Sequence, residues 1–181
     1  MNLSALAKQA VENYIKGKKI IDPPGDLPNE FLTDRAGAFV TIEKIGDLRN
    51  PPHSRGEAEL RGCIGTHLPT RKNIAEEIIY NAIAAATEDY RFGQIEKAEL
   101  PYLHYSVYIL GKPQPVKDLK ELDPKKYGII VKAAGKSGLL LPDLEGVDKV
   151  EQQIAIACRK AGILPAQEKL SIDKFTAKKY K

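Results

Sequence analysis

The sequence predicts an α+β fold in which a mostly antiparallel sheet is flanked by helices. Three observations support this prediction. Some segments repeat their apolar residues at helical spacing, and others alternate apolar and polar residues as strands do. The two kinds of segment do not alternate regularly, which disfavours parallel crossover units. The length of 181 residues fits one domain over residues 1–181, or two small lobes with a discontinuous boundary that share a core.

The first half of the chain is expected to contain a helix, two strands and a longer helix, in that order. Apolar residues at helical spacing predict an opening helix that Gly17 ends. Residues 38–42 and 60–66 have the composition of strands. A helix with an apolar face then follows Thr70, its expected N-cap, and ends near residues 88–89. Between the two strands, the proline-rich residues 50–56 indicate a turn or loop, which contains His53.

The second half is expected to contain a strand, a hairpin and a last helix. Residues 102–109 alternate in the pattern of a strand. Residues 128–131 and 138–141 form a predicted hairpin, and its turn contains a Gly-Lys-Ser sequence that lacks the earlier glycine of a phosphate-binding loop. Asp148 and Glu151 fit a capping box that begins the last helix, and Gly162 ends it.

Composition narrows the class of protein. Hydrophobic residues make up 43% and charged residues 29%, as in ordinary globular domains. The net charge of +4 comes partly from lysines near the ends, and such runs are more typical of solvated surface than of a nucleic-acid interface. We expect no membrane span, no metal and no cofactor, because long apolar runs and paired Cys or His spacings are missing. Two distant cysteines without a signal peptide indicate the reducing cytoplasm.

Several motifs in order resemble the AMMECR domain family. The hallmark is Leu-Arg-Gly-Cys-Ile-Gly-Thr at residues 60–66, and Asp-Tyr-Arg-Phe at residues 89–92 resembles a second signature. Glu-Leu-Pro at residues 99–101, the strand that follows it and the glycine-containing strands of the hairpin are similar to further ones. The resemblance covers essentially the whole chain. One departure is Gly93-Gln94, where the family often has a proline.

The family resemblance implies an α+β domain of two lobes. It also implies membership of a prokaryotic set with two partners, a Memo-like protein and a radical SAM enzyme. Neither composition nor spacing in this chain indicates those partners.

The hallmark strand contains the best candidate for a chemical site. Strict alternation would place Arg61 and Cys63 on one face, with Leu60, Gly62 and Ile64 on the other. A guanidinium beside the thiol favours the thiolate, so Arg61 is expected to activate Cys63. Gly62 and Gly65 would let a ligand or another backbone approach closely.

Further residues around this strand complete the hypothesis of a small anionic ligand. Free N–H groups at a helix N-terminus near Arg71 would receive an anion, and Thr66 lies just before that loop. His67 is a candidate general base, as in Cys/His hydrolases. Asp89 and Arg91 could orient the ligand, although such a pair more often ties a helix end to a loop.

Two interpretations of this cluster stay open. In the first, Cys63 is the nucleophile or redox thiol of an enzyme, with Arg61, His67 and the residues that bind the ligand around it. In the second, the chain is a non-catalytic binding or adaptor module, in which Cys63 is structural and the glycines serve close packing. The sequence names neither a substrate nor a reaction.

Overall fold

The computed structural model describes residues 1–45, 58–165 and 168–181, and its fold is α+β with antiparallel sheets, as predicted. The chain divides into two compact units. The first unit comprises Met1–Ile109 with Lys179–Lys181, and the second comprises Leu110–Lys178. Each unit has a sheet of its own and a hydrophobic core of its own.

A four-stranded sheet with the order β2-β1-β3-β8 organises the first unit. Its strands are β1 (Ala38–Ile45), β2 (Ala58–Thr66), β3 (Leu103–Leu110) and β8 (Ala177–Tyr180). β1 pairs antiparallel with both β2 and β3, so β2 is an edge strand. The hallmark motif therefore lies at the edge of a sheet.

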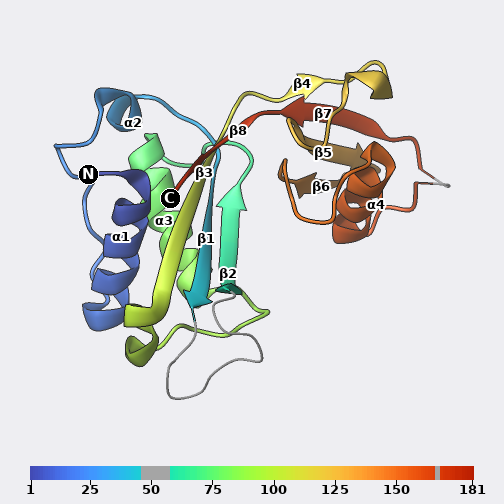
Figure 1. Cartoon of the computed structure of the whole chain (residues 1–181). Helices are drawn as coiled ribbons and strands as arrows, with labels where there is room; N and C mark the ends of the chain where they lie inside the picture. The colour runs from blue at the N-terminus through green and yellow to red at the C-terminus, as the bar shows by residue number, and fades with distance from the viewer. Residues whose placement is uncertain (46–57, 166–167) are drawn as a thin grey trace. The chain divides into compact units, whose positions relative to one another are not determined.

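Two helices cover one side of this sheet (Figure 1). Helix α1 (Leu3–Gly17) and helix α3 (Ile74–Thr87) pack on each other, and α3 also packs on β1 and β2. Apolar residues at helical spacing face inward from α1, which is why the opening segment folds as a helix. The core between helices and sheet is formed by buried side chains that include Leu6, Val11, Val40, Ile42, Ile78, Ile79 and Val107.

Two short helices complete the first unit. Helix α2 (Asn29–Thr33) follows a proline-containing segment. The 3-10 helix η1 (Lys97–Tyr102) directly precedes β3 and begins with a capping box between Glu96 and Glu99. Glu99 thus has a local structural role, and it also contacts the hallmark strand.

The second unit is a smaller sheet with the order β4-β7-β5-β6 and one helix. Its strands are β4 (Gln114–Pro115), β5 (Gly128–Ala133), β6 (Lys136–Leu140) and β7 (Ser171–Phe175), and the 3-10 helix η2 spans Leu119–Glu121. β5 and β6 form the predicted hairpin, whose turn residues Ala134 and Gly135 both have positive φ. Helix α4 (Val150–Ala161) packs on β5 and β6.

Three details of the predicted elements are wrong. The N-cap of α3 is Asn73, whose side chain accepts from the Glu76 N–H, and Thr70 lies in the preceding loop. The cap of α4 uses Gln152, which accepts from the backbone at Asp148 and Lys149, so the predicted box is shifted by one residue. The C-terminal segment was given no secondary structure, but it forms strands β7 and β8.

The predictions for the loop 50–56 and for the absence of a membrane span can be compared with the described residues only. His53 and the loop 50–56 lie outside the described residues. Among the helices that the structure describes, none is both long enough and apolar enough to cross a membrane.

Candidate functional site

The hallmark strand β2 contains a bulge at Arg61. Gly62 pairs with Ile42 of β1, whereas Leu60 pairs with Glu43, so Arg61 is the extra residue. Ile42 and Glu43 are neighbours in β1, so their side chains lie on opposite faces of the sheet. Each pairing partner shares the face of the residue it opposes, so Leu60 and Gly62 also lie on opposite faces. The strict alternation expected from the sequence is therefore wrong at this point.

Arg61 is fully engaged by the segment that precedes β3. Its Nε and Nη2 donate to the two carboxylate oxygens of Glu99 at 2.8 and 3.0 Å. Nη1 and Nη2 also donate to the carbonyls of Gly93 and Gln94 at 3.0 and 3.1 Å. Every nitrogen of the guanidinium thus has a protein acceptor, so Arg61 ties the edge strand to η1 and the loop before it.

The Glu99 carboxylate is held in its charged form by this contact. Burial would raise its pKa, but hydrogen bonds from Arg61 and the Glu96 N–H, with the charges of Arg61 and Lys44, lower the pKa to about 2. The bidentate geometry is the strong form of an arginine–carboxylate pair.

Cys63 lies next to Arg61 in sequence but has different partners. Its Sγ is 3.4 Å from Oγ1 of Thr41, the residue that pairs with it on β1. Its N–H donates to Oδ2 of Asp89 at 2.8 Å, and its carbonyl accepts from Nη2 of Arg91 at 3.4 Å. The side chain of Cys63 is half-buried. Asp89 and Arg91 therefore take the two backbone groups that an adjacent strand would otherwise pair.

Asp89 is the buried anchor of this arrangement. Its side chain is only 3% exposed, and its carboxylate receives Nε and Nη2 of Arg91 at 2.9 and 2.7 Å. The hydrogen bond from Arg91 lowers its pKa most, burial opposes that, and the Cys63 N–H lowers it further, so the pKa falls to about 2. The same bond raises the pKa of Arg91, with a smaller contribution from the nearby Cys63.

The outer part of this turn is exposed. Tyr90 is 94% exposed, and the Arg91 side chain remains 44% exposed although its guanidinium pairs with Asp89. The guanidinium carbon of Arg91 also lies 5.0 Å from the centre of the Phe92 ring. A fixed turn thus presents an aromatic ring and a cation beside Cys63.

Gly62 and Gly65 are required by packing inside the first unit. A Cβ at Gly62 would lie 2.2 Å from the carbonyl oxygen of Ala85 in α3. A Cβ at Gly65 would lie 2.3 Å from Cγ of Phe39 and 2.4 Å from the carbonyl oxygen of Ala38. Both glycines allow close approach, but by the protein's own backbone and side chains.

The Glu77 carboxylate accepts hydrogen bonds from the backbone N–H groups near Arg71 that were expected from the sequence to bind an anionic ligand. This helix residue is 1% exposed, and it accepts from the backbone N–H groups of Thr70 and Arg71 at 2.7 and 2.8 Å. The Thr66 and Thr70 hydroxyls donate to it at 2.6 and 2.9 Å. Burial would raise its pKa, but these hydrogen bonds outweigh it and lower the pKa.

Sequence reasoning missed Glu77, although a signal was available. It lies three residues after Ile74 and next to Ile78, on the apolar face of a predicted amphipathic helix, where an acidic residue must have buried partners. Thr66 consequently binds Glu77, and the N–H groups of Thr70 and Arg71 are not available to a ligand in this arrangement.

The predicted site residues are thus only partly brought together. Cys63, Asp89 and Arg91 are in contact. His67 is exposed and lies beyond the end of β2, four residues from Cys63, which corresponds to about 13 Å along an extended chain. Among the described residues, no group of three His, Cys, Asp or Glu side chains is placed to hold a metal ion.

Fold and hallmark strand together define an α+β protein with a helix-covered sheet whose edge carries the motif. Residues 4–180 match the family model AMMECR1, so the chain belongs to that family. A Thermotoga maritima protein is 48% identical over 97% of this chain and 94% of its own length. The Clostridium acetobutylicum protein CA_C1420 is 42% identical over 97% of this chain, which spans 35% of that longer protein.

A solved structure agrees with the fold. The crystal structure of the uncharacterized protein PH0010 from Pyrococcus horikoshii has a TM-score of 0.83 with this chain at 34% identity. The match covers 98% of this chain and 88% of that one.

Proposed function

We propose that this chain is a binding module that docks a partner protein through the Tyr90–Arg91 turn at the edge of β2. One observation carries the proposal: the buried Asp89 fastens the turn to the Cys63 backbone and leaves Tyr90 94% exposed. A fully exposed tyrosine on a rigid support has no role in the core of the first unit. Tyrosine and arginine are also the residues most enriched among the dominant contacts of interfaces.

The fixed geometry of the turn favours binding. Asp89 receives hydrogen bonds from both the Arg91 side chain and the Cys63 N–H, so the turn has few conformations to lose on docking. Pre-organised surface residues bind more tightly because less conformational entropy is lost. The exposed cation of Arg91 favours a partner surface with acidic groups next to an apolar patch.

The neighbouring side chains support binding more than catalysis. Arg61 is taken by Glu99 and two carbonyls, and Thr66 is taken by Glu77. His67 is exposed and lies four residues beyond Cys63 along an extended strand, which does not favour it as the base for the Cys63 thiol. Arg61 and Thr66, two of the residues expected to assist a catalytic thiol, therefore have other partners.

The family resemblance suggests which partners to test. It implies a Memo-like protein and a radical SAM enzyme, and we propose that one of them docks here, in the cytoplasm. The Clostridium relative is longer, and the matching region forms only 35% of it. This supports a module that works beside another protein domain.

The test is a calorimetric titration of this chain with the Memo-like and the radical SAM protein of the same organism. Tyr90→Ala should weaken binding by at least tenfold, about the effect of losing one dominant contact. Leu119→Ala is the matched control, because it removes an exposed apolar side chain from the second unit and should leave affinity unchanged. Equal affinities for Tyr90→Ala and the native chain would refute the proposal.

A second candidate is thiol chemistry at Cys63 on a small anionic ligand. It is favoured by one observation, the proximity of Arg91, whose pKa is raised first by Asp89 and in smaller part by Cys63. In this version Arg91, and not Arg61, is the cation that binds the ligand beside the sulfur. The rate of Cys63 alkylation against pH tests it: a thiol that titrates well below about 8.5 in the native chain, but not in Arg91→Gln, would support this candidate.

A further inference from the structure

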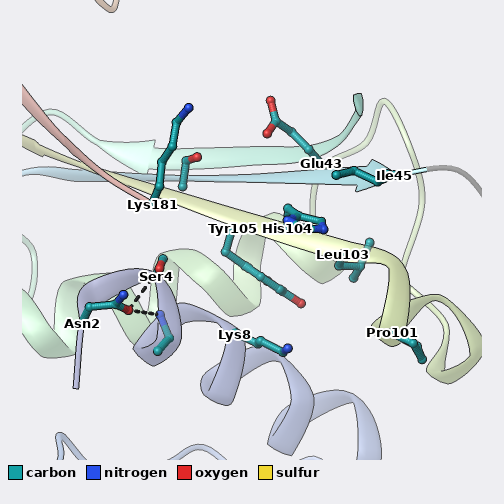
Figure 2. Close-up of a pocket in the computed structure, with 12 residues that line it drawn as sticks. Asn2, Ser4, Lys8, Glu43, Ile45, Pro101, Leu103, His104, Tyr105 and Lys181 are labelled. Atoms are coloured by element: carbon teal, nitrogen blue, oxygen red, sulfur yellow. Dashed lines mark hydrogen bonds between the residues drawn. The ribbon is translucent and has the colours of Figure 1, made fainter. Parts of the chain in front are cut away.

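A separate hollow lies in the first unit, and none of its described lining residues belongs to the hallmark strand (Figure 2). Its volume is about 640 Å³, within the usual range for small-molecule sites. Four consecutive residues of β3, from Leu103 to Ser106, line it. Because neighbours in a strand face opposite sides, a hollow that all four line must lie beside the edge of the strand. The first turns of α1 and Lys181, just after β8, form other parts of the wall.

Tyr105 contributes a buried hydroxyl group that has no partner. The side chain is only 7% exposed, and its hydroxyl makes no hydrogen bond to any described residue. Figure 2 shows the ring extending from β3 toward α1, with the hydroxyl at its far end. Burial, with a smaller effect of the Glu12 charge, raises the pKa of Tyr105, so the hydroxyl keeps its proton and remains a donor. A buried donor without an acceptor is unfavourable and needs an explanation.

The charges around the hollow favour a negative ligand. Lys8 and Lys181 both line it, and Glu43 is the single acidic side chain among its described lining residues. The N-terminus of α1 adds a partial positive charge, and the first turn of this helix has no acidic residue. The Lys8 ammonium is only weakly paired, at 3.9 Å from Glu12, and its side chain is 54% exposed.

We infer that this hollow binds a small organic anion whose carboxylate or phosphate oxygen accepts from the Tyr105 hydroxyl and lies beside the Lys8 ammonium. The Ser4 hydroxyl, which donates to Asn2 in the structure, lies on the same wall at the start of α1. This site is independent of the Tyr90–Arg91 turn.

The test uses inorganic phosphate and succinate as probes, with sodium chloride at matched ionic strength as the control. Tyrosine-ring NMR signals of the native chain should shift and saturate in the millimolar range with at least one probe, and the Tyr105 signal should shift most. Saturation by phosphate alone would assign the site to phosphate esters, and saturation by succinate alone to carboxylates. Saturation by neither probe would overturn the inference.

Variants then separate binding from folding. Tyr105→Phe removes only the unpartnered hydroxyl, so the chain should stay folded while affinity for the probe falls about tenfold. Tyr14→Phe removes the same atom from a tyrosine of α1 that does not line the hollow, and should bind as the native chain does. Unchanged affinity in Tyr105→Phe would contradict the assigned donor.

The charge of Lys8 has its own matched pair. Lys8→Gln should weaken probe binding severalfold, while Lys16→Gln, two turns further along α1, should not. Equal losses in both variants would indicate a general effect of net charge and would count against a site.

Discussion

Both units of this protein place a glycine of an edge strand under a helix. In the first unit, a Cβ at Gly62 of β2 would lie 2.2 Å from the carbonyl oxygen of Ala85. In the second, a Cβ at Gly138 of β6 would lie 2.1 Å from that of Ala157. β2 and β6 are end strands in the strand orders of their sheets. In both units, a glycine in an edge strand thus allows the backbone of a helix to approach closely.

The two edges differ in the polar groups that cover them. At β6 an exposed lysine, Lys160, donates to the Leu139 carbonyl. At β2 a buried carboxylate and an arginine, Asp89 and Arg91, bind the Cys63 backbone, and Arg61 makes a second, half-buried pair with Glu99. Because β6 packs against its helix without such a network, glycine packing alone does not require one. The network at β2 therefore points to a task beyond packing, which we propose is the display of Tyr90 and Arg91.

The largest expected effect tests the shared packing. Gly62→Ala and Gly138→Ala should each destabilise the folded state by about 3 kcal/mol, because the new methyl group meets a helix backbone that cannot move aside. Urea unfolding, followed by hydrogen exchange in each unit, measures both the size and the location of the loss.

Gly17→Ala is the matched control for that pair. A Cβ at Gly17 meets nothing within 4 Å, and the residue ends α1 without positive φ. We expect no loss, or a gain of about 0.5 kcal/mol from the better helix propensity of alanine. If Gly62→Ala changed the free energy of unfolding no more than Gly17→Ala does, the hallmark glycine would have a role other than packing.

A smaller effect is expected at the buried Asp89 carboxylate of the first unit. Folding lowers the Asp89 pKa from 3.8 to about 2, so its carboxylate stabilises the folded state above pH 4 by about 2 kcal/mol. That contribution should disappear as the pH falls from about 4 to 2.

Asp89→Asn isolates this effect. The variant should be less stable than the native chain at neutral pH by about 2 kcal/mol, and the two stabilities should converge near pH 2. Chemical unfolding at a series of pH values measures the difference. A gap that persists unchanged into acid would show that Asp89 acts through packing and not through its charge.

The smallest effects on stability distinguish the two cysteines. Cys158 is 1% exposed in the core of the second unit, so Cys158→Ala should destabilise by about 1 kcal/mol. Cys63 is half-buried on the sheet, and Cys63→Ala should change stability by no more than about 0.5 kcal/mol. In the native chain, iodoacetamide should modify Cys63 first. Mass spectrometry measures the rate at each cysteine. Faster modification of Cys158 would contradict the assignment of Cys63 as the more accessible thiol.

Sequence patterns predicted the elements whose cause is local. The apolar period of α1, the alternation of β3 and the hairpin of β5 and β6 each depend on neighbouring residues, and all three elements were predicted. The connection in the hairpin was predicted over residues 132–137, whereas the strands leave a turn of only Ala134 and Gly135. The last two strands were missed, because lysines interrupt their pattern. β7 is nevertheless paired on both sides, with β4 and β5, and its Phe175 is 2% exposed.

The candidate site was harder to predict because it depends on contacts distant in sequence. Arg61 was assigned to the thiol, but its partner Glu99 comes 38 residues later and is recognisable only after folding. The bulge that redirects Arg61 is a matter of register between β1 and β2, which the sequence of one strand does not encode. By contrast, Asp89 and Arg91 are two residues apart, so their pairing near a helix end could be anticipated from the sequence.

The central claim is that the edge of β2 displays Tyr90 and does not serve Cys63. One titration of Tyr90→Ala and Cys63→Ala, side by side, against the Memo-like and radical SAM proteins tests it directly. We predict that the tyrosine variant loses at least tenfold in affinity while the cysteine variant binds like the native chain. Loss of binding in Cys63→Ala, with Tyr90→Ala unaffected, would contradict the account.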